Sequence, residues 1–195
     1  MNRTLKITSI ALLTALSVAS NFMTIQLVPN VAAVSLTITI CFLTGIYFGI
    51  MPAIIVGYVG DLIAHLIHPY GAYNWFLALS YALFGVICAL VYKLPIKNRI
   101  VKLLIALVTC FVVCGCGLNT FGLWLQYKVD VEPGLMGLFT FLTSSKQPAI
   151  SFGMYLVNAR LPFLLLNYAF NGVVVAILQQ TNMLDKLMIR INEEK

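Results

Sequence analysis

Residues 57–75 read Gly-Tyr-Val-Gly-Asp-Leu-Ile-Ala-His-Leu-Ile-His-Pro-Tyr-Gly-Ala-Tyr-Asn-Trp. The segment begins as an apolar run with a single carboxylate, Asp61, and ends as an aromatic loop containing Pro69 and Gly71. The apolar run, continued upstream to residue 52, predicts a membrane-spanning helix. A carboxylate inside such a helix is costly and normally faces a cavity or a partner. The segment therefore predicts both a membrane fold and a polar site.

The rest of the chain has the same apolar character. Of its 195 residues, 61% are hydrophobic and 9% are charged, which is typical of an integral membrane protein. The apolar runs are continuous, and this favours helices over barrel strands. We predict a single all-α membrane domain over residues 1–195, a bundle of six transmembrane helices at about 5–24, 34–49, 52–67, 75–92, 101–126 and 153–179.

The basic residues predict the orientation of this bundle. Nine of the twelve fall at the two ends and in the linker between the fourth and fifth helices, whereas only Lys128 and Lys146 fall in the alternate loops and Arg160 lies inside the last helix. Basic residues concentrate on the cytoplasmic side of membrane proteins. We therefore expect both termini in the cytoplasm and the loop after Ile67 outside. The net charge of +6 is explained by this bias and indicates no nucleic-acid partner.

A stripe of alanines marks the first predicted helix. Ala11, Ala15 and Ala19 recur every four residues, so they lie on one face and allow another helix to approach closely. Packing inside the bundle and docking of a partner membrane subunit both explain this spacing.

Two charged residues lie well inside predicted helices. Asp61 and Arg160 can form a structural ion pair, or they can line a polar binding site. A guanidinium offers five donors in a rigid fork, which suits a carboxylate or the acceptor edge of a heterocycle. Asp61, His65 and His68 also share one helical face, a spacing compatible with a metal ion. We do not expect a metal there, because His68 directly precedes Pro69 and belongs to the helix end.

Aromatic and amide residues gather on the predicted outer side. Tyr73, Asn74 and Trp75 follow the Pro–Gly loop directly, where the mouth of a pocket is expected. Flat rings with a few amides suit a planar heterocyclic ligand. Asn158 and Asn167 add amides in the last helix, with hydrogen bonding between helices as the alternative for both. The predicted substrate-binding residues are Asp61, Tyr73, Asn74, Trp75, Asn158, Arg160 and Asn167.

Taken together, the chain resembles the substrate-binding S component of an energy-coupling factor (ECF) vitamin transporter, and it is most similar to the folate-type branch. Residues 74–78, Asn-Trp-Phe-Leu-Ala, depart from that branch, which tends to carry a Phe-Pro-Gly-Phe-Thr-like segment there. The resemblance covers most of the chain, and its elements are the alanine stripe, Gly45-x-x-x-Gly49, Gly57-x-x-Gly60-Asp61-Leu62, Pro69-Tyr70-Gly71-Ala72-Tyr73, Leu79-Ser80, Gly85 and Ala159-Arg160-Leu161-Pro162.

The resemblance implies a multi-pass protein of the bacterial cell membrane that binds a water-soluble vitamin, with folate as the expected ligand. It also implies two kinds of partner, a membrane coupling subunit and two cytoplasmic ATPases, with Ala11, Ala15 and Ala19 facing the coupling subunit. We expect no cofactor and no catalytic residue, because the sequence has no Gly-rich phosphate loop and no His-Glu-x-x-His motif. The alternatives are a structural membrane scaffold that binds no ligand and an intramembrane enzyme that uses the face of Asp61, His65 and His68.

Overall fold

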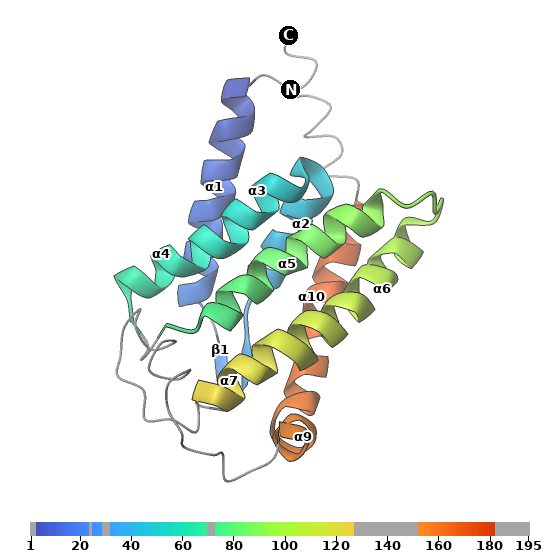
Figure 1. Ribbon diagram of the computed structural model, residues 1–195. Helices are drawn as coiled ribbons and strands as arrows, with labels where there is room; N and C mark the ends of the chain where they lie inside the picture. Colours follow the sequence, from blue (N-terminus) through green and yellow to red (C-terminus); the bar gives the residue numbers. More distant parts are fainter. Residues whose placement is uncertain (1–2, 24, 29–31, 70–72, 127–151, 182–195) are drawn as a thin grey trace.

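The computed structural model describes residues 3–23, 25–28, 32–69, 73–126 and 152–181, and Figure 1 shows the arrangement of their elements. Several of the long helices contain π-helical turns, which are labelled η. The elements are α1 (Arg3–Phe22), β1 (Ile25–Val28), β2 (Ala32–Val34), α2 (Thr37–Phe48), α3 (Ile50–Ile54), η1 (Ile55–Val59), α4 (Gly60–Ile67), α5 (Trp75–Tyr92), α6 (Arg99–Cys110), η2 (Phe111–Asn119), α7 (Thr120–Gln126), α9 (Phe152–Tyr155), η3 (Leu156–Arg160) and α10 (Leu161–Gln180).

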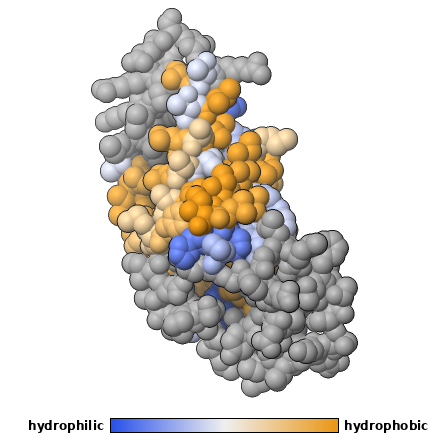
Figure 2. Space-filling view, turned by 90° about the vertical axis from the view of Figure 1, so that its left-hand side faces the viewer, coloured by the Kyte–Doolittle hydropathy of each residue, from blue (hydrophilic) through white to orange (hydrophobic). Residues whose placement is uncertain are grey.

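The described residues form a helical membrane protein. Five of their helical segments are long and apolar enough to cross a bilayer: Thr4–Phe22, Ile50–Ile67, Trp75–Tyr92, Arg99–Leu125 and Leu161–Gln180. Their exposed side chains include many Ile, Leu and Val residues, and Figure 2 shows the apolar surface on the face that carries α1 and α4. Such a surface is suited to contact with lipid.

The second predicted helix differs from the expectation. It was expected over residues 34–49, but α2 has only 12 residues and a length of about 18 Å, which is short for a bilayer crossing. α2 ends at Phe48, and Gly49 follows with a φ of 87°, a backbone conformation that glycine adopts more readily than other residues. Upstream, residues that were expected in a loop form an antiparallel hairpin in which Ile25 pairs with Val34.

The core of the bundle lies around α2. This helix packs against α5, α3, α1 and α10, and most of its residues are buried. Phe42 on α2 contacts Phe84 on α5, with ring centroids 6.2 Å apart, and Phe84 also contacts Tyr168 on α10 at 5.8 Å. The Tyr168 hydroxyl donates a hydrogen bond to the Cys110 carbonyl oxygen at 3.1 Å, which ties α10 to α6.

Two glycines allow α5 to approach its neighbours at backbone distance. A Cβ atom added at Gly45 on α2 would lie 2.1 Å from the Gly85 carbonyl oxygen, and one added at Gly57 in η1 would lie 2.6 Å from the Tyr81 backbone. Small residues permit such close crossings in membrane bundles. Of the pair Gly45 and Gly49, only Gly45 therefore serves helix packing, while Gly49 serves the turn.

Gly45→Ala is expected to destabilise the fold by at least about 1–3 kcal/mol, the usual cost of overpacking, because the new methyl group meets rigid backbone. Thermal unfolding in detergent measures the effect. Gly117→Ala is the matched control, since a Cβ atom there would lie 3.5 Å from its nearest neighbour, the Val112 carbonyl oxygen. Equal melting temperatures for the two variants would contradict the close crossing.

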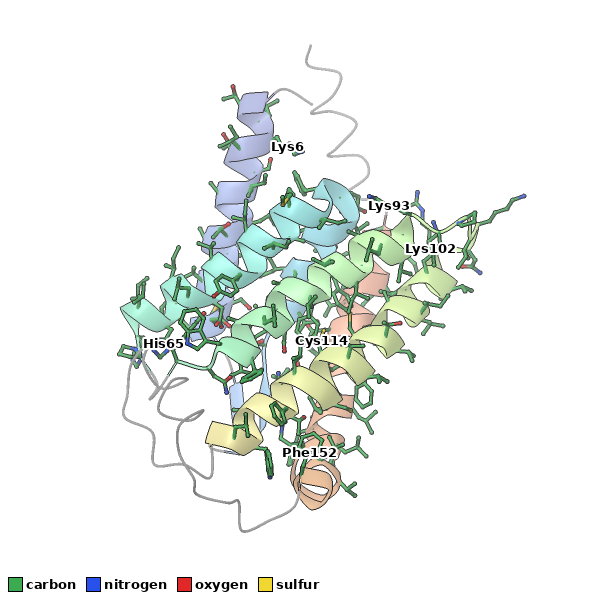
Figure 3. All side chains as sticks on the ribbon, in the orientation of Figure 1. Lys6, His65, Lys93, Lys102, Cys114 and Phe152 are labelled. Atoms are coloured by element: carbon green, nitrogen blue, oxygen red, sulfur yellow. The ribbon has the colours of Figure 1, made fainter. Side chains whose placement is uncertain are left out.

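The two ends of the bundle differ in chemistry. Lys6, Lys93 and Lys102 lie at one end, and His65 and Phe152 lie toward the other (Figure 3). Lys102 donates a hydrogen bond to the Tyr92 carbonyl oxygen at 2.8 Å, so it helps to complete the end of α5. The arrangement agrees with the expected segregation of basic residues. That the basic end is cytoplasmic stays a prediction.

Candidate functional site

Four aromatic side chains line one wall of the candidate site, and we call them the aromatic wall: Tyr58, His65, Tyr73 and Trp75. The His65 and Tyr73 rings are 4.9 Å apart between centroids, and Tyr73 meets Trp75 edge-to-face at 5.0 Å. Tyr58 in η1 lies 6.3 Å from Trp75. Tyr58, Asp61 and His65 fall on one helical face, so the continuous segment of η1 and α4 presents a carboxylate among these rings.

Tyr73 and Asp61 form the polar part of this wall. The Tyr73 side chain is 4% exposed, and its hydroxyl makes no hydrogen bond of ordinary geometry within the described residues. Burial, together with the charge of nearby Asp61, raises the pKa of Tyr73. The hydroxyl therefore remains protonated as a donor and is available, beside the half-buried Asp61, to a bound molecule.

Arg160 lies on a different helix and is 6% exposed. It is the last residue of η3, directly before Leu161-Pro162 at the start of α10. Its Nη2 donates a hydrogen bond of 2.9 Å to Oδ1 of Asn119, the last residue of η2. Both side chains thus follow π-helical turns, which shift the angular position of the residues after them and are frequent at functional sites.

Asn119 was not among the predicted substrate-binding residues. In the sequence it is one of several amides on the expected outer side, and its spacing carries no signal of its own. Its role depends on contact with Arg160, which lies 41 residues away in the chain. Only the tertiary structure brings the two together.

Asp61 and Arg160 lie on different helical segments of the bundle, α4 and η3. Whether they form the structural ion pair considered from the sequence or line a binding site stays a prediction. Tyr81 on α5 is nevertheless within range of both charges. The site therefore has a carboxylate on the α4 side and a guanidinium on the α10 side, with α5 between them. Such an arrangement can bind a molecule that has donors at one edge and acceptors at another.

Asn74 caps the helix that follows the loop. Its side-chain oxygen accepts hydrogen bonds from the backbone N–H groups of Phe76 and Leu77, at 3.1 and 3.4 Å. It is the N-cap of α5, a position that asparagine favours strongly. Because the carbonyl oxygen is used by the helix, Asn74 contributes to the site chiefly by fixing where α5 begins, directly beside Trp75.

Asn167 belongs to a network that joins α10 to the segment before α2 and to α2 itself. Asn171 is fully buried and donates hydrogen bonds to the Asn167 side-chain oxygen at 2.9 Å and to the Ser35 carbonyl oxygen at 3.0 Å. Its own oxygen accepts from the Thr39 hydroxyl at 2.7 Å. These contacts favour the structural interpretation of Asn167. The side chain of Asn158 lies outside the described residues.

The alanine stripe lies on the outer face of α1. Ala11, Ala15 and Ala19 are all exposed. The opposite face meets the bundle, where Ser17 and Ser20 are buried and Ser20 accepts a hydrogen bond from the Thr37 hydroxyl at 3.2 Å. Packing inside the bundle therefore does not account for the stripe.

The histidines show no metal-site geometry in the described part of the chain. No three His, Cys, Asp or Glu side chains there are grouped so that they could hold a metal ion. His65 packs on Tyr73, and His68 is exposed beside Phe22, with ring centroids 6.4 Å apart. Both contacts are with aromatic rings.

Comparison with known proteins identifies a family. Residues 1–180 match the family model described as ECF-type riboflavin transporter, S component. None of the curated proteins matches the chain. The matched residues include the alanine stripe, the aromatic wall, Asp61, Asn119 and Arg160.

Proposed function

Because the chain belongs to the ECF-type riboflavin transporter S component family, we propose that it binds a planar, water-soluble vitamin on the outer side of the membrane and delivers it for import. In this role the chain works with a membrane coupling subunit and two ATPases, which supply the energy. The aromatic wall beside Asp61, together with the buried Arg160, is the observation that carries the proposal. No catalytic step is assigned to the chain.

Riboflavin is the first candidate ligand, and the matching family is named for it. Its three fused rings are flat and suit contact with Tyr73 and Trp75. The carbonyl groups at one edge of the rings accept hydrogen bonds, which suits Arg160. The hydroxyl groups of the ribityl chain donate them, which suits Asp61 and its neighbour Tyr73. Riboflavin is neutral, and its hydrogen bonds to charged side chains are of the stronger, charge-assisted kind.

Folate is the second candidate, and the presence of one buried cation and one carboxylate favours it. The amino-substituted pterin ring offers donors to Asp61, and the glutamate carboxylates offer acceptors to Arg160. The resemblance of residues 57–73 to the folate-type branch points the same way. Residues 74–78 depart from that branch, and because Asn74 caps α5, this departure changes the wall next to Trp75.

We also propose that Ala11, Ala15 and Ala19 form the docking face for the coupling subunit. Their exposure and their location opposite Ser17 and Ser20 support this assignment. A smooth helix face lets a partner helix approach to backbone distance, which is how membrane helices associate without a hydrophobic driving force.

Calorimetric titration of the purified chain with riboflavin, folate and other water-soluble vitamins tests the ligand. We expect one vitamin to bind with 1:1 stoichiometry and to raise the melting temperature, since a ligand at about 100 times its Kd stabilises the native state by about 2.7 kcal/mol. Tight binding of riboflavin and not folate would select the first candidate, and the reverse would select the second. Binding of neither, with no stabilisation by any vitamin, would favour the scaffold alternative.

A further inference from the structure

α1 and α4 pack closely at Ser17 and Gly60. A Cβ atom added at Gly60 would lie 2.8 Å from the Ser17 Oγ atom and 3.1 Å from its Cβ atom. Ser17 has no exposed surface, and its hydroxyl oxygen makes no hydrogen bond within the described residues. The short serine side chain therefore fills the space above the bare glycine backbone.

The two residues of this contact belong to different functional regions. Gly60 directly precedes Asp61, and a step of about 100° along the helix turns Asp61 away from α1 toward Tyr73. Ser17 lies between Ala15 and Ala19 in the sequence but on the opposite face of α1, since it is buried while they are exposed. One contact thus connects the helix that carries the carboxylate with the helix that carries the docking face.

The segment before Gly60 also packs closely against α5. Gly57 lies in η1 and approaches the backbone of Tyr81 on α5 so closely that a Cβ atom would lie 2.6 Å away. A π-helical turn has longer-range hydrogen bonds than an α-helix and is frequent at functional sites. A shift of α4 about η1 is therefore expected to displace α1, because the Ser17 side chain packs directly on Gly60 and closely packed interiors transmit strain.

We propose, building on the function proposed above, that the Ser17–Gly60 contact couples occupation of the vitamin site to the docking face of α1. Binding of a vitamin to Asp61 and Tyr73 shifts α4, and the shift of α4 moves α1 through this contact. Coupling between two binding sites is reciprocal, so docking of the coupling subunit changes vitamin affinity by the same factor.

A double-mutant cycle tests the proposal on the full chain. The measured quantity is the coupling factor, the ratio of dissociation constants for the coupling subunit–ATPase complex without and with saturating riboflavin, or folate if the titration selects it. For the wild type we expect the factor to differ from 1 by about fivefold or more. Gly60→Ala, which forces the helices apart, and Ser17→Gly, which leaves a gap, should each bring it within about twofold of 1. The double variant should restore it, since the methyl group introduced at position 60 fills the space left by the serine side chain.

Gly117→Ala is the matched control and should keep the wild-type factor, since a Cβ atom there fits without displacement. A wild-type factor of 1, or an unchanged factor in Ser17→Gly, would overturn the proposal. If Gly60→Ala does not fold, Ser17→Gly and the double variant complete the test, and a folded double variant then supports the contact. If the wild-type chain binds no vitamin, the result counts instead against the proposed function itself.

Discussion

Arg160→Ala is expected to lower vitamin affinity by about 10- to 100-fold, because it removes hydrogen bonds to a charged group worth about 1.5–3 kcal/mol. The guanidinium is buried beside Asn119, so a hydrogen bond from it to a ligand forms where water competes weakly. Titration calorimetry on the purified chain measures the loss.

Arg160→Lys should fall between the wild type and Arg160→Ala, since an ammonium keeps the charge but lacks the planar fork. Arg99→Ala is the matched control, because Arg99 is exposed at the first turn of α6, away from the site. Wild-type affinity in Arg160→Ala, with the fold verified by its elution volume and melting temperature, would remove Arg160 from the site.

Ala15→Phe is expected to abolish association with the coupling subunit, and with it uptake, while vitamin affinity stays within about twofold of the wild type. Ala15 is the middle residue of the exposed stripe, and a bulky ring there prevents the close approach of a partner helix. Co-purification with the coupling subunit and uptake of labelled vitamin into cells measure the two effects.

Ala169→Phe makes the same change on the exposed face of α10, and it should leave both association and uptake intact. If Ala15→Phe also reduced vitamin binding, the stripe would have a packing role inside the bundle. Normal uptake by Ala15→Phe would place the docking face elsewhere.

The helix boundaries could be predicted where local chemistry sets them. The expected helix over residues 75–92 coincides with α5, because the Pro–Gly loop ends at Asn74 and the basic linker begins at Lys93. The fifth helix begins two residues earlier than expected, at Arg99, because the Asn98 side chain accepts a hydrogen bond from the Ile100 N–H at 2.9 Å. An asparagine cap is readable in a sequence, but here it lies within a run of basic residues that is typical of a linker.

Other features depend on tertiary contacts and could not be read from hydropathy. The π-helical turns η1, η2 and η3 involve a change in hydrogen-bond register that leaves no pattern in an apolar run. The length of α2 is set by the hairpin before it and by Gly49 after it, whereas its apolar composition extends further in both directions.

In the candidate site, too, some features could be predicted from the sequence and others depend on tertiary contacts. The cost of burying a charge predicts that Asp61 and Arg160 are special, but it does not say whether they pair. For amides the sequence was less informative, because Asn74, Asn119 and Asn167 have the same chemistry and different partners. One caps a helix, one binds Arg160 and one joins a buried network. Hydrogen-bond partners, and not residue type, separate these roles.

The central claim is that this chain alone binds a planar vitamin between the α4 and α10 sides of the bundle. Mass spectrometry of small molecules that co-purify with the wild type and with Arg160→Ala, prepared in parallel, tests it most directly. The account predicts a vitamin with fused aromatic rings in the wild-type sample at close to one per chain, and its loss from the variant. A folded wild-type protein that retains no such molecule and is stabilised by no vitamin added afterwards would contradict the account.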